Sequence, residues 1–144
     1  MLSVREDLIH YLMEQTGLQA YYNMPPVNVG ISMPILILEE VENSDVFYRY
    51  YDDETEQEMA SVSYEISIYT TNPQDLIVML PIIDRVMKRI GFKKSWTSGD
   101  NVIEPLYCKS MRFTGKINKQ NGNYMIYSWP RKDDINYGYV ISSN

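Results

Sequence analysis

The sequence has little of the chemistry on which enzymes and metal proteins depend. Its 144 residues include one cysteine, Cys108, and one histidine, His10. A single cysteine excludes an internal disulfide and disfavours a cysteine-based zinc site, and no second histidine is present to complete a metal set or a nucleophile–base pair. The seven glycines form no phosphate-binding loop pattern. We therefore predict no enzymatic activity, no cofactor and no bound metal.

Long apolar runs are also lacking. No stretch approaches the roughly 20 apolar residues that a membrane-spanning helix needs. The first residues, MLSVREDLIHYL, place acids and a histidine where a signal peptide has an apolar core. We expect synthesis in the cytoplasm and no membrane partner. The length favours one domain with its own core, and 44% hydrophobic with 22% charged residues is typical of a soluble globular protein.

A helix is predicted near the N-terminus, from Ser3 to Gln15. Ser3 and Glu6 match the S-x-x-E capping box, and Gly17 is placed to cap the other end. Apolar residues recur at helical spacing and should face the core. They are Val4, Leu8, Ile9 and Leu12.

Strand patterns follow. The segment Leu18–Asn23 predicts a short strand, and Pro34–Val41 predicts a strand whose four consecutive aliphatic residues indicate burial on both faces. Asn43–Asp45 has turn composition, and Val46–Tyr51 is expected to be extended. Met59–Thr70 alternates between apolar and polar residues, which predicts a long, half-buried antiparallel strand.

A second helix is predicted after Asn72, a favourable N-cap, with Pro73 at its first position and Gly91 at its end. Pro81 should either kink this helix or mark its true start, because proline removes a backbone hydrogen bond. Its apolar residues recur at spacings of three and four, so Met79 and Met87 are expected to fill the core. The full apolar set is Leu76, Met79, Leu80, Ile83, Val86, Met87 and Ile90.

The remaining third of the chain is predicted to form mainly strands. Phe92–Thr97 and Tyr107–Asn118 are predicted strands that enclose a polar loop, Ser98–Asn101. Asn121-Gly122 has the sequence of a two-residue hairpin turn. It would pair Met111–Ile117 with Tyr124–Trp129.

The order of these elements predicts an α+β fold, a mainly antiparallel sheet flanked by two helices with an additional C-terminal hairpin and arm. Residues 1–118 would form the main domain. Residues 119–144 would add the hairpin strand and an arm that orders only against a partner.

Charge is unevenly distributed along the chain. Nine acidic residues and one arginine lie between Glu39 and Glu58, whereas eleven basic and two acidic residues lie between Arg85 and Lys132. Two interpretations remain open: a bipolar surface suited to head-to-tail association, or charges that mix in space once the strands pair. The candidate ring-interface or channel residues are Asp52, Asp53, Glu54, Glu56, Glu58, Lys88, Arg89, Lys93 and Lys94.

Other polar residues have simpler interpretations. His10 lies off the apolar stripe of its helix and should have a structural or solvated role, and Cys108 should be a small buried residue. Adjacent carboxylates at Glu39-Glu40 and Asp52-Asp53 would point to opposite faces of a strand, so neither pair suits acid–base catalysis across a substrate. The basic region suggests nucleic-acid binding as a possible function. The net charge of −6 on the whole chain argues against a protein that binds DNA on its own.

Several segments in series resemble the tail terminator proteins of long-tailed bacteriophages, also called tail-completion or tail-to-head joining proteins. They are TGLQAYYN after the first helix, the strand PILILEEVEN, the long strand SVSYEISIYTTNPQDL, the helix end RIGFK and the strand YCKSMRFTGKI. The resemblance spans about Ser3 to Asn118. Pro81 departs from an uninterrupted second helix, and the segment after Asn118 looks like an addition.

The resemblance implies a sheet flanked by helices and a homo-oligomeric ring, a hexamer, that caps the tail tube and docks onto the connector of the head. The partners would be the tail tube protein, the head connector or stopper protein, and genomic DNA that passes without sequence-specific binding. The protein would be found in the tail or neck of the virion, and in the host cytoplasm during assembly. Residues 52–58 then become candidates for the ring interface or for an acidic channel wall that repels DNA phosphates.

Three alternatives compete with this interpretation. One is another neck component, such as a connector stopper or a minor tail protein. Another is a small cytoplasmic adaptor module that binds a partner through an edge strand. The last is a small hydrolase, which would need a pair of carboxylates in a cleft.

Overall fold

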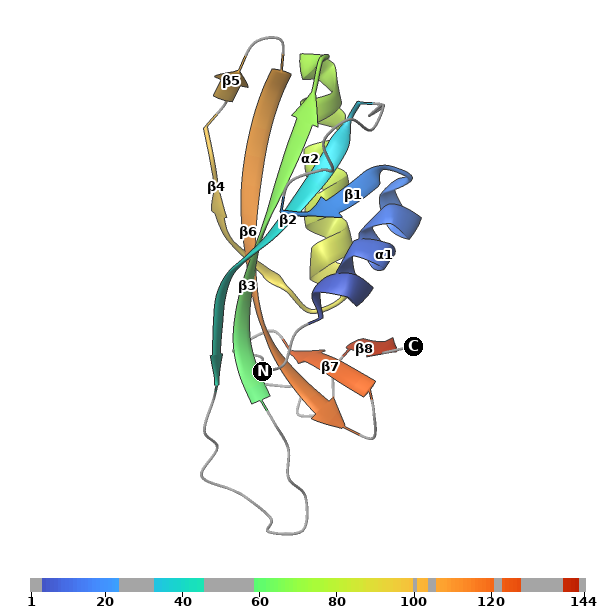
Figure 1. Ribbon diagram of the computed structural model, residues 1–144, viewed down its shortest axis with the longest axis vertical. Helices are drawn as coiled ribbons and strands as arrows, with labels where there is room; N and C mark the ends of the chain where they lie inside the picture. Colours follow the sequence, from blue (N-terminus) through green and yellow to red (C-terminus); the bar gives the residue numbers. More distant parts are fainter. Residues whose placement is uncertain are drawn as a thin grey trace.

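The structure is a computed structural model that describes residues 4–23, 33–45, 59–99, 101–103, 106–120, 123–127 and 139–142. These residues form two helices and eight strands (Figure 1). In chain order they are α1 (Arg5–Thr16), β1 (Gln19–Tyr22), β2 (Ile35–Asp45), β3 (Met59–Thr70), α2 (Pro73–Arg89), β4 (Lys93–Thr97), β5 (Asn101–Ile103), β6 (Leu106–Gln120), β7 (Asn123–Tyr127) and β8 (Tyr139–Ser142).

The strands form one sheet in the order β1-β2-β3-β6-β7-β8. Strands β4 and β5 also pair with β6, so the β6 edge that does not face β3 is shared by three short strands. All pairs are antiparallel except β1–β2, which is parallel. Both helices lie on one side of the sheet (Figure 1). The α+β prediction of a mainly antiparallel sheet with two helices is confirmed.

The core lies between the helices and the sheet. The α1 stripe is confirmed, because Val4, Leu8 and Leu12 are buried and Ile9 packs against them. The first four residues of β2 are buried on both faces, as their aliphatic run predicts. The strand residues in the core cluster are Ala20, Leu36, Leu38, Val62, Tyr64, Ile66, Ile68, Met111, Phe113 and Ile117.

Helix α2 begins as its sequence predicts. The Asn72 side chain accepts a hydrogen bond from the Gln74 amide at 3.1 Å, and the Thr70 hydroxyl donates to Asp75 at 2.6 Å. The helix is continuous through Pro81, so the alternative start near that residue is wrong. Pro81 is exposed, which lets water satisfy the carbonyl that loses its helical donor.

The end of α2 is a Schellman motif. Gly91 adopts a φ of 100°, its amide donates to the Lys88 carbonyl at 3.0 Å, and the Phe92 amide donates to the Met87 carbonyl at 3.1 Å. Met87 and Phe92 are both buried, which supplies the hydrophobic contact that accompanies this motif. The predicted glycine cap is therefore confirmed, and it directs the chain from α2 into β4.

Two boundaries in the first half differ from the prediction. Helix α1 begins at Arg5 with Val4 at its N-cap position and no side-chain cap, later than predicted, and Ser3 of the predicted capping box lies outside the described residues. Asn43–Asp45 is not a turn, because β2 continues to a pairing of Asp45 with Ala60. A bulge between Glu40 and Glu42 shifts the ladder, and the polar residues that follow it remain in the strand.

The C-terminal part also differs. Strand β5 begins at Asn101, the last residue of the predicted polar loop, and pairs with Leu106–Cys108 of β6, so the predicted strand at Tyr107–Asn118 has a short strand before it that was not predicted. Strands β6 and β7 pair on either side of the predicted turn position, but the paired segments are Lys116–Gln120 and Asn123–Tyr127 rather than the longer segments predicted. Residues 139–142 form β8 against β7, so this part of the expected arm pairs within the chain. The predictions for Val46–Tyr51 and for residues 52–58 lie outside the described residues.

Candidate interaction surface

The face of the sheet opposite the helices carries a row of four polar or aromatic side chains. Residues in register on neighbouring strands share a face, and the ladder places Glu39, Glu65, Arg112 and Trp96 side by side on β2, β3, β6 and β4. Arg112 Nε donates to Glu65 Oε1 at 3.0 Å, and its guanidinium carbon lies 4.9 Å from the centre of the Trp96 ring. Trp96 is 44% exposed. We call this side of the sheet the open face.

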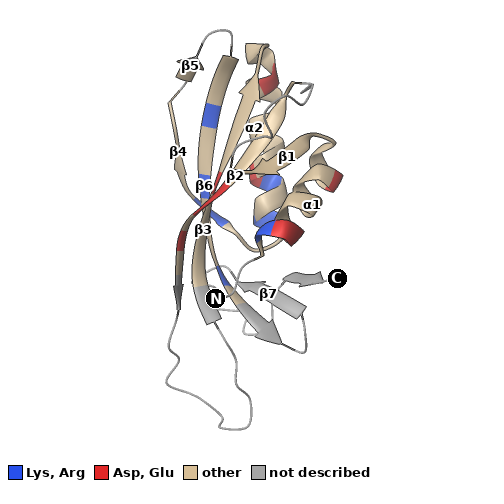
Figure 2. Cartoon of the chain, viewed as in Figure 1, with Lys and Arg blue, Asp and Glu red and all other residues tan. Residues whose placement is uncertain are grey.

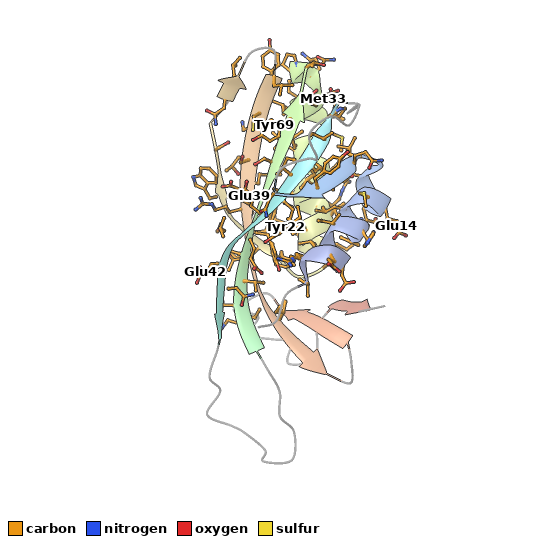
Figure 3. All side chains as sticks on the ribbon, in the orientation of Figure 1. Glu14, Tyr22, Met33, Glu39, Glu42 and Tyr69 are labelled. Atoms are coloured by element: carbon orange, nitrogen blue, oxygen red, sulfur yellow. The ribbon has the colours of Figure 1, made fainter. Side chains whose placement is uncertain are left out.

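The next row has the same order of charges. Glu42, Ser63, Thr114 and Lys93 are in register on β2, β3, β6 and β4. Glu42 projects away from the helices (Figure 3). In the following row Ser61 faces Lys116 of β6. Acidic side chains therefore lie on β2 and β3, and basic side chains lie on β6 and β4.

Figure 2 shows this separation as acidic segments along β2 and basic segments along β6. Among the described residues of the open face, Arg112–Glu65 is the ion pair that joins the two halves. Strands β3 and β6 separate β2 from β4, so the acidic residues of β2 and the basic residue of β4 are about 14 Å apart at the usual strand spacing. In the described part of the sheet the charges are segregated rather than mixed.

A concavity lies in the basic half, where β4 and β7 meet end to end along β6. Lys93 of β4 pairs with Thr114, Lys116 pairs with Tyr127 of β7, and Gly115 lies between these two pairings. The concavity has a volume of about 540 Å³. Its described lining residues are Ser61, Lys93, Lys94, Ser95, Thr114, Gly115 and Lys116.

Hydroxyl pairs fix the two central strands beside this concavity. Ser63 and Thr114 are 2.9 Å apart, and the buried pair Ser67 and Ser110 is 2.7 Å apart. Each pair satisfies polar groups that would otherwise be left without a partner in a largely buried setting. Lys116 of β6 is therefore presented by a strand whose register with β3 is held by side chains as well as by the backbone.

The structure separates the predicted basic residues into two groups. Lys93 and Lys94 line the concavity, and Lys94 also lies 3.9 Å from Asp84 of α2. Lys88 and Arg89 lie in the last turn of α2, where Lys88 bonds Asp84 at 2.9 Å. The predicted acidic residues lie outside the described residues. They are Asp52, Asp53, Glu54, Glu56 and Glu58.

Sequence reasoning missed Trp96, Arg112 and Lys116 as members of one surface. A signal was present, because Arg112, Thr114 and Lys116 alternate and therefore share one side of a strand. Their strand partners could not be deduced from that alternation.

On the side of the sheet that the helices cover, polar groups form hydrogen bonds between the elements that pack together. The fully buried Tyr64 donates to Glu40 Oε1 at 3.0 Å and accepts from the Val4 amide at 3.4 Å, which ties the start of α1 to the sheet. Glu40 also accepts from the Asn43 side chain at 3.1 Å. The predicted opposite orientation of Glu39 and Glu40 is confirmed, because Glu40 is in register with Tyr64 and Glu39 with Glu65.

The remaining titratable candidates are consistent with structural roles. His10 is exposed, and Cys108 is 5% exposed, as expected. Burial, followed by the neighbouring Cys108, raises the pKa of Tyr69 to about 12. Burial, followed by the charge of Glu6, raises the pKa of Asp7. Within the described ranges, no group of three or more potential metal ligands occurs.

No helix among the described residues is long and apolar enough to cross a membrane. A scan against protein-family models and a search of curated proteins found no match to the chain.

Proposed function

We propose that the protein is a structural virion protein, a tail terminator whose copies form a ring by head-to-tail contact. The observation that supports this most directly is the division of the open face into an acidic side on β2 and β3 and a basic side on β6 and β4. A surface of this kind is complementary to a second copy of itself after a rotation. Repeating that contact produces a ring if the rotation closes.

Electrostatics favour this contact over binding of nucleic acid. The chain carries a net charge of −6, so a polyanion is repelled at long range. A neighbouring copy instead offers acidic and basic regions together, and its acidic side attracts the basic side of the next. Added salt should weaken the ring, because exposed charges are screened beyond about 8 Å at physiological ionic strength.

In the proposed assembly the ring caps the completed tail tube and binds the head connector or stopper. Genomic DNA passes through the ring without sequence-specific binding. The protein is then part of the tail or neck of the virion, after assembly in the host cytoplasm. The ordered series of segments that resembles tail terminators supports this placement.

The test is the mass of the purified protein in solution, measured by light scattering at low and high salt, with and without assembled tail tubes. We expect a hexamer, or a ring that appears on tube ends, and in either case less of it at high salt. A protein that stays monomeric at every salt concentration and does not bind tail tubes would contradict the proposal.

A second candidate is a small adaptor module, favoured by Trp96. Every residue of β4 is exposed, and this edge strand presents a half-exposed tryptophan beneath an arginine. Tryptophan and arginine are enriched among the residues that dominate binding energy at interfaces. A monomer that binds one partner through β4, and does not bind tail tubes, would favour this function over the ring.

A further inference from the structure

We propose that the lysine concavity binds the acidic segment Asp52–Glu58 of a second copy of the chain. The proposal rests on the proposed ring and names the contact that holds it together. It assigns the interface to Lys93, Lys94 and Lys116, and it excludes the α2 residues Lys88 and Arg89.

The lining of the concavity suits carboxylates. Lys93 and Lys116 supply charged donors, and the hydroxyls of Ser61, Ser95 and Thr114 can donate as well. Lys94 also borders the concavity, where it lies 3.9 Å from Asp84 of α2. Among the described residues none of the lining side chains is acidic. A volume of about 540 Å³ is within the range of binding sites for small ligands, so several side chains of a short segment fit.

The sequence of the occupant matches this lining. DDETEQE contains five acidic residues among its seven and no lysine or arginine. Each copy therefore carries both halves of the contact.

The direction of β3 favours a neighbouring copy over the same chain. Residue 58 joins β3 at Met59, and β3 at this point pairs with Asn118, beyond the Ser61–Lys116 pair that borders the concavity. The described end of β3 therefore lies beyond the positions of β6 that pair with β4, on the side away from Lys93 and Lys94. A segment that entered the concavity of its own chain would leave the wild-type protein monomeric, so the mass in solution separates the two arrangements.

The decisive experiment mixes two variants that each lack one half of the contact. The first neutralises the segment with Asp52→Asn, Asp53→Asn, Glu54→Gln, Glu56→Gln and Glu58→Gln. The second neutralises the concavity with Lys93→Gln, Lys94→Gln and Lys116→Gln. The control removes two basic residues of α2 that lie outside the concavity, with Arg85→Gln and Arg89→Gln, and it keeps Lys88 because that lysine shares Asp84 with Lys94.

We expect each variant alone to be monomeric at 16.9 kDa and the control to assemble like the wild type. An equimolar mixture should double the mass and go no further, because a single productive contact can form between the two variants. Assembly of either variant alone, or a mixture that stays monomeric, would overturn the proposal. A mixture that stays monomeric while the wild type forms rings overturns this contact and leaves the ring; a wild type that never assembles overturns both.

A peptide measurement keeps the proposal testable if a variant fails to fold. A synthetic peptide of residues 51–59 should bind the wild-type protein in calorimetry and disperse its assemblies. Its affinity should fall at least about tenfold for a folded single variant, Lys93→Gln, and should not change for Arg89→Gln. No binding of the peptide, or tighter binding of a DNA oligonucleotide in the same assay, would contradict the assignment.

Discussion

Arg112 donates to Glu65 across the central strand pair at 3.0 Å, and this bond marks the boundary between the basic and acidic halves of the open face. The same guanidinium lies over Trp96, so the arginine is held from both sides. Its charge is thereby partly neutralised, and the neighbouring Lys93 and Lys116 line the concavity. The Arg112–Glu65 pair is therefore expected to fix the side chains of the open face, and to contribute little to the stability of the fold.

Replacing Arg112 with glutamine tests this expectation. The arginine is 47% exposed, so its loss should lower the free energy of unfolding by about 1 kcal/mol, from a weak ion pair and a weak cation–π contact. Urea unfolding gives this quantity, with Lys93→Gln as a control on the same face. A loss of about 3 kcal/mol or more would show that the pair behaves as a buried one.

Tyr64→Phe tests the anchor between α1 and the sheet. Its hydroxyl is buried with Glu40 and the Val4 amide as partners, so its removal should cost about 1–3 kcal/mol of unfolding free energy. Tyr21→Phe, at a half-buried position on β1, is the matched control and should change little. Equal effects in urea unfolding would argue against the anchor.

The backbone conformation of Gly91 at the end of α2 predicts the effect of a substitution on stability. Because Gly91 has a φ of 100°, Gly91→Ala should lower the free energy of unfolding by about 1–2 kcal/mol. Gly99→Ala is the control, since an added methyl group there meets nothing within 4 Å and no positive φ is required. If both variants had the same thermal unfolding midpoint, the Schellman motif would carry no specific energetic role.

Tyr69 should make the fold sensitive to alkali. Its pKa is raised from 10.0 to about 12, so between these values the unfolded chain has released a proton that the folded chain retains. Stability should therefore be unaffected below pH 10 and should fall as pH rises toward 12. Tyr69→Phe should reduce this fall, measured by urea unfolding at pH 9 and pH 11. An unchanged fall would assign it to other groups.

Elements with strong local patterns could be predicted from the sequence. The alternation of β3 and the caps of α2 depend on residues close in the chain, and both were placed correctly. The parallel pairing of β1 with β2 and the docking of β8 on β7 could not be predicted, because they depend on distant partners. The bulge at Val41 also escaped prediction, since it depends on how β2 follows β3.

The candidate surface was predictable only in part. The charge contrast and Lys93 and Lys94 were visible along the chain, but the placement of these lysines on β4 and of Lys88 and Arg89 on α2 was not. That placement arises because Gly91 ends α2 and turns the chain into the sheet. Lys116 joined the same site through the register of β6 with β3 and β7, which is a property of three strands together.

Strand β6 has 15 residues and is bordered along its length by β3 on one edge and by β5, β4 and β7 in turn on the other. A single inserted residue near Ser110 would move every later side chain to the opposite face relative to all its neighbours. The buried Phe113 and Ile117 would then face solvent, while Lys116 would enter the core. Relatives of this protein should therefore vary freely in the identity of open-face residues on β6 but keep its length, with insertions and deletions confined to the connections between strands.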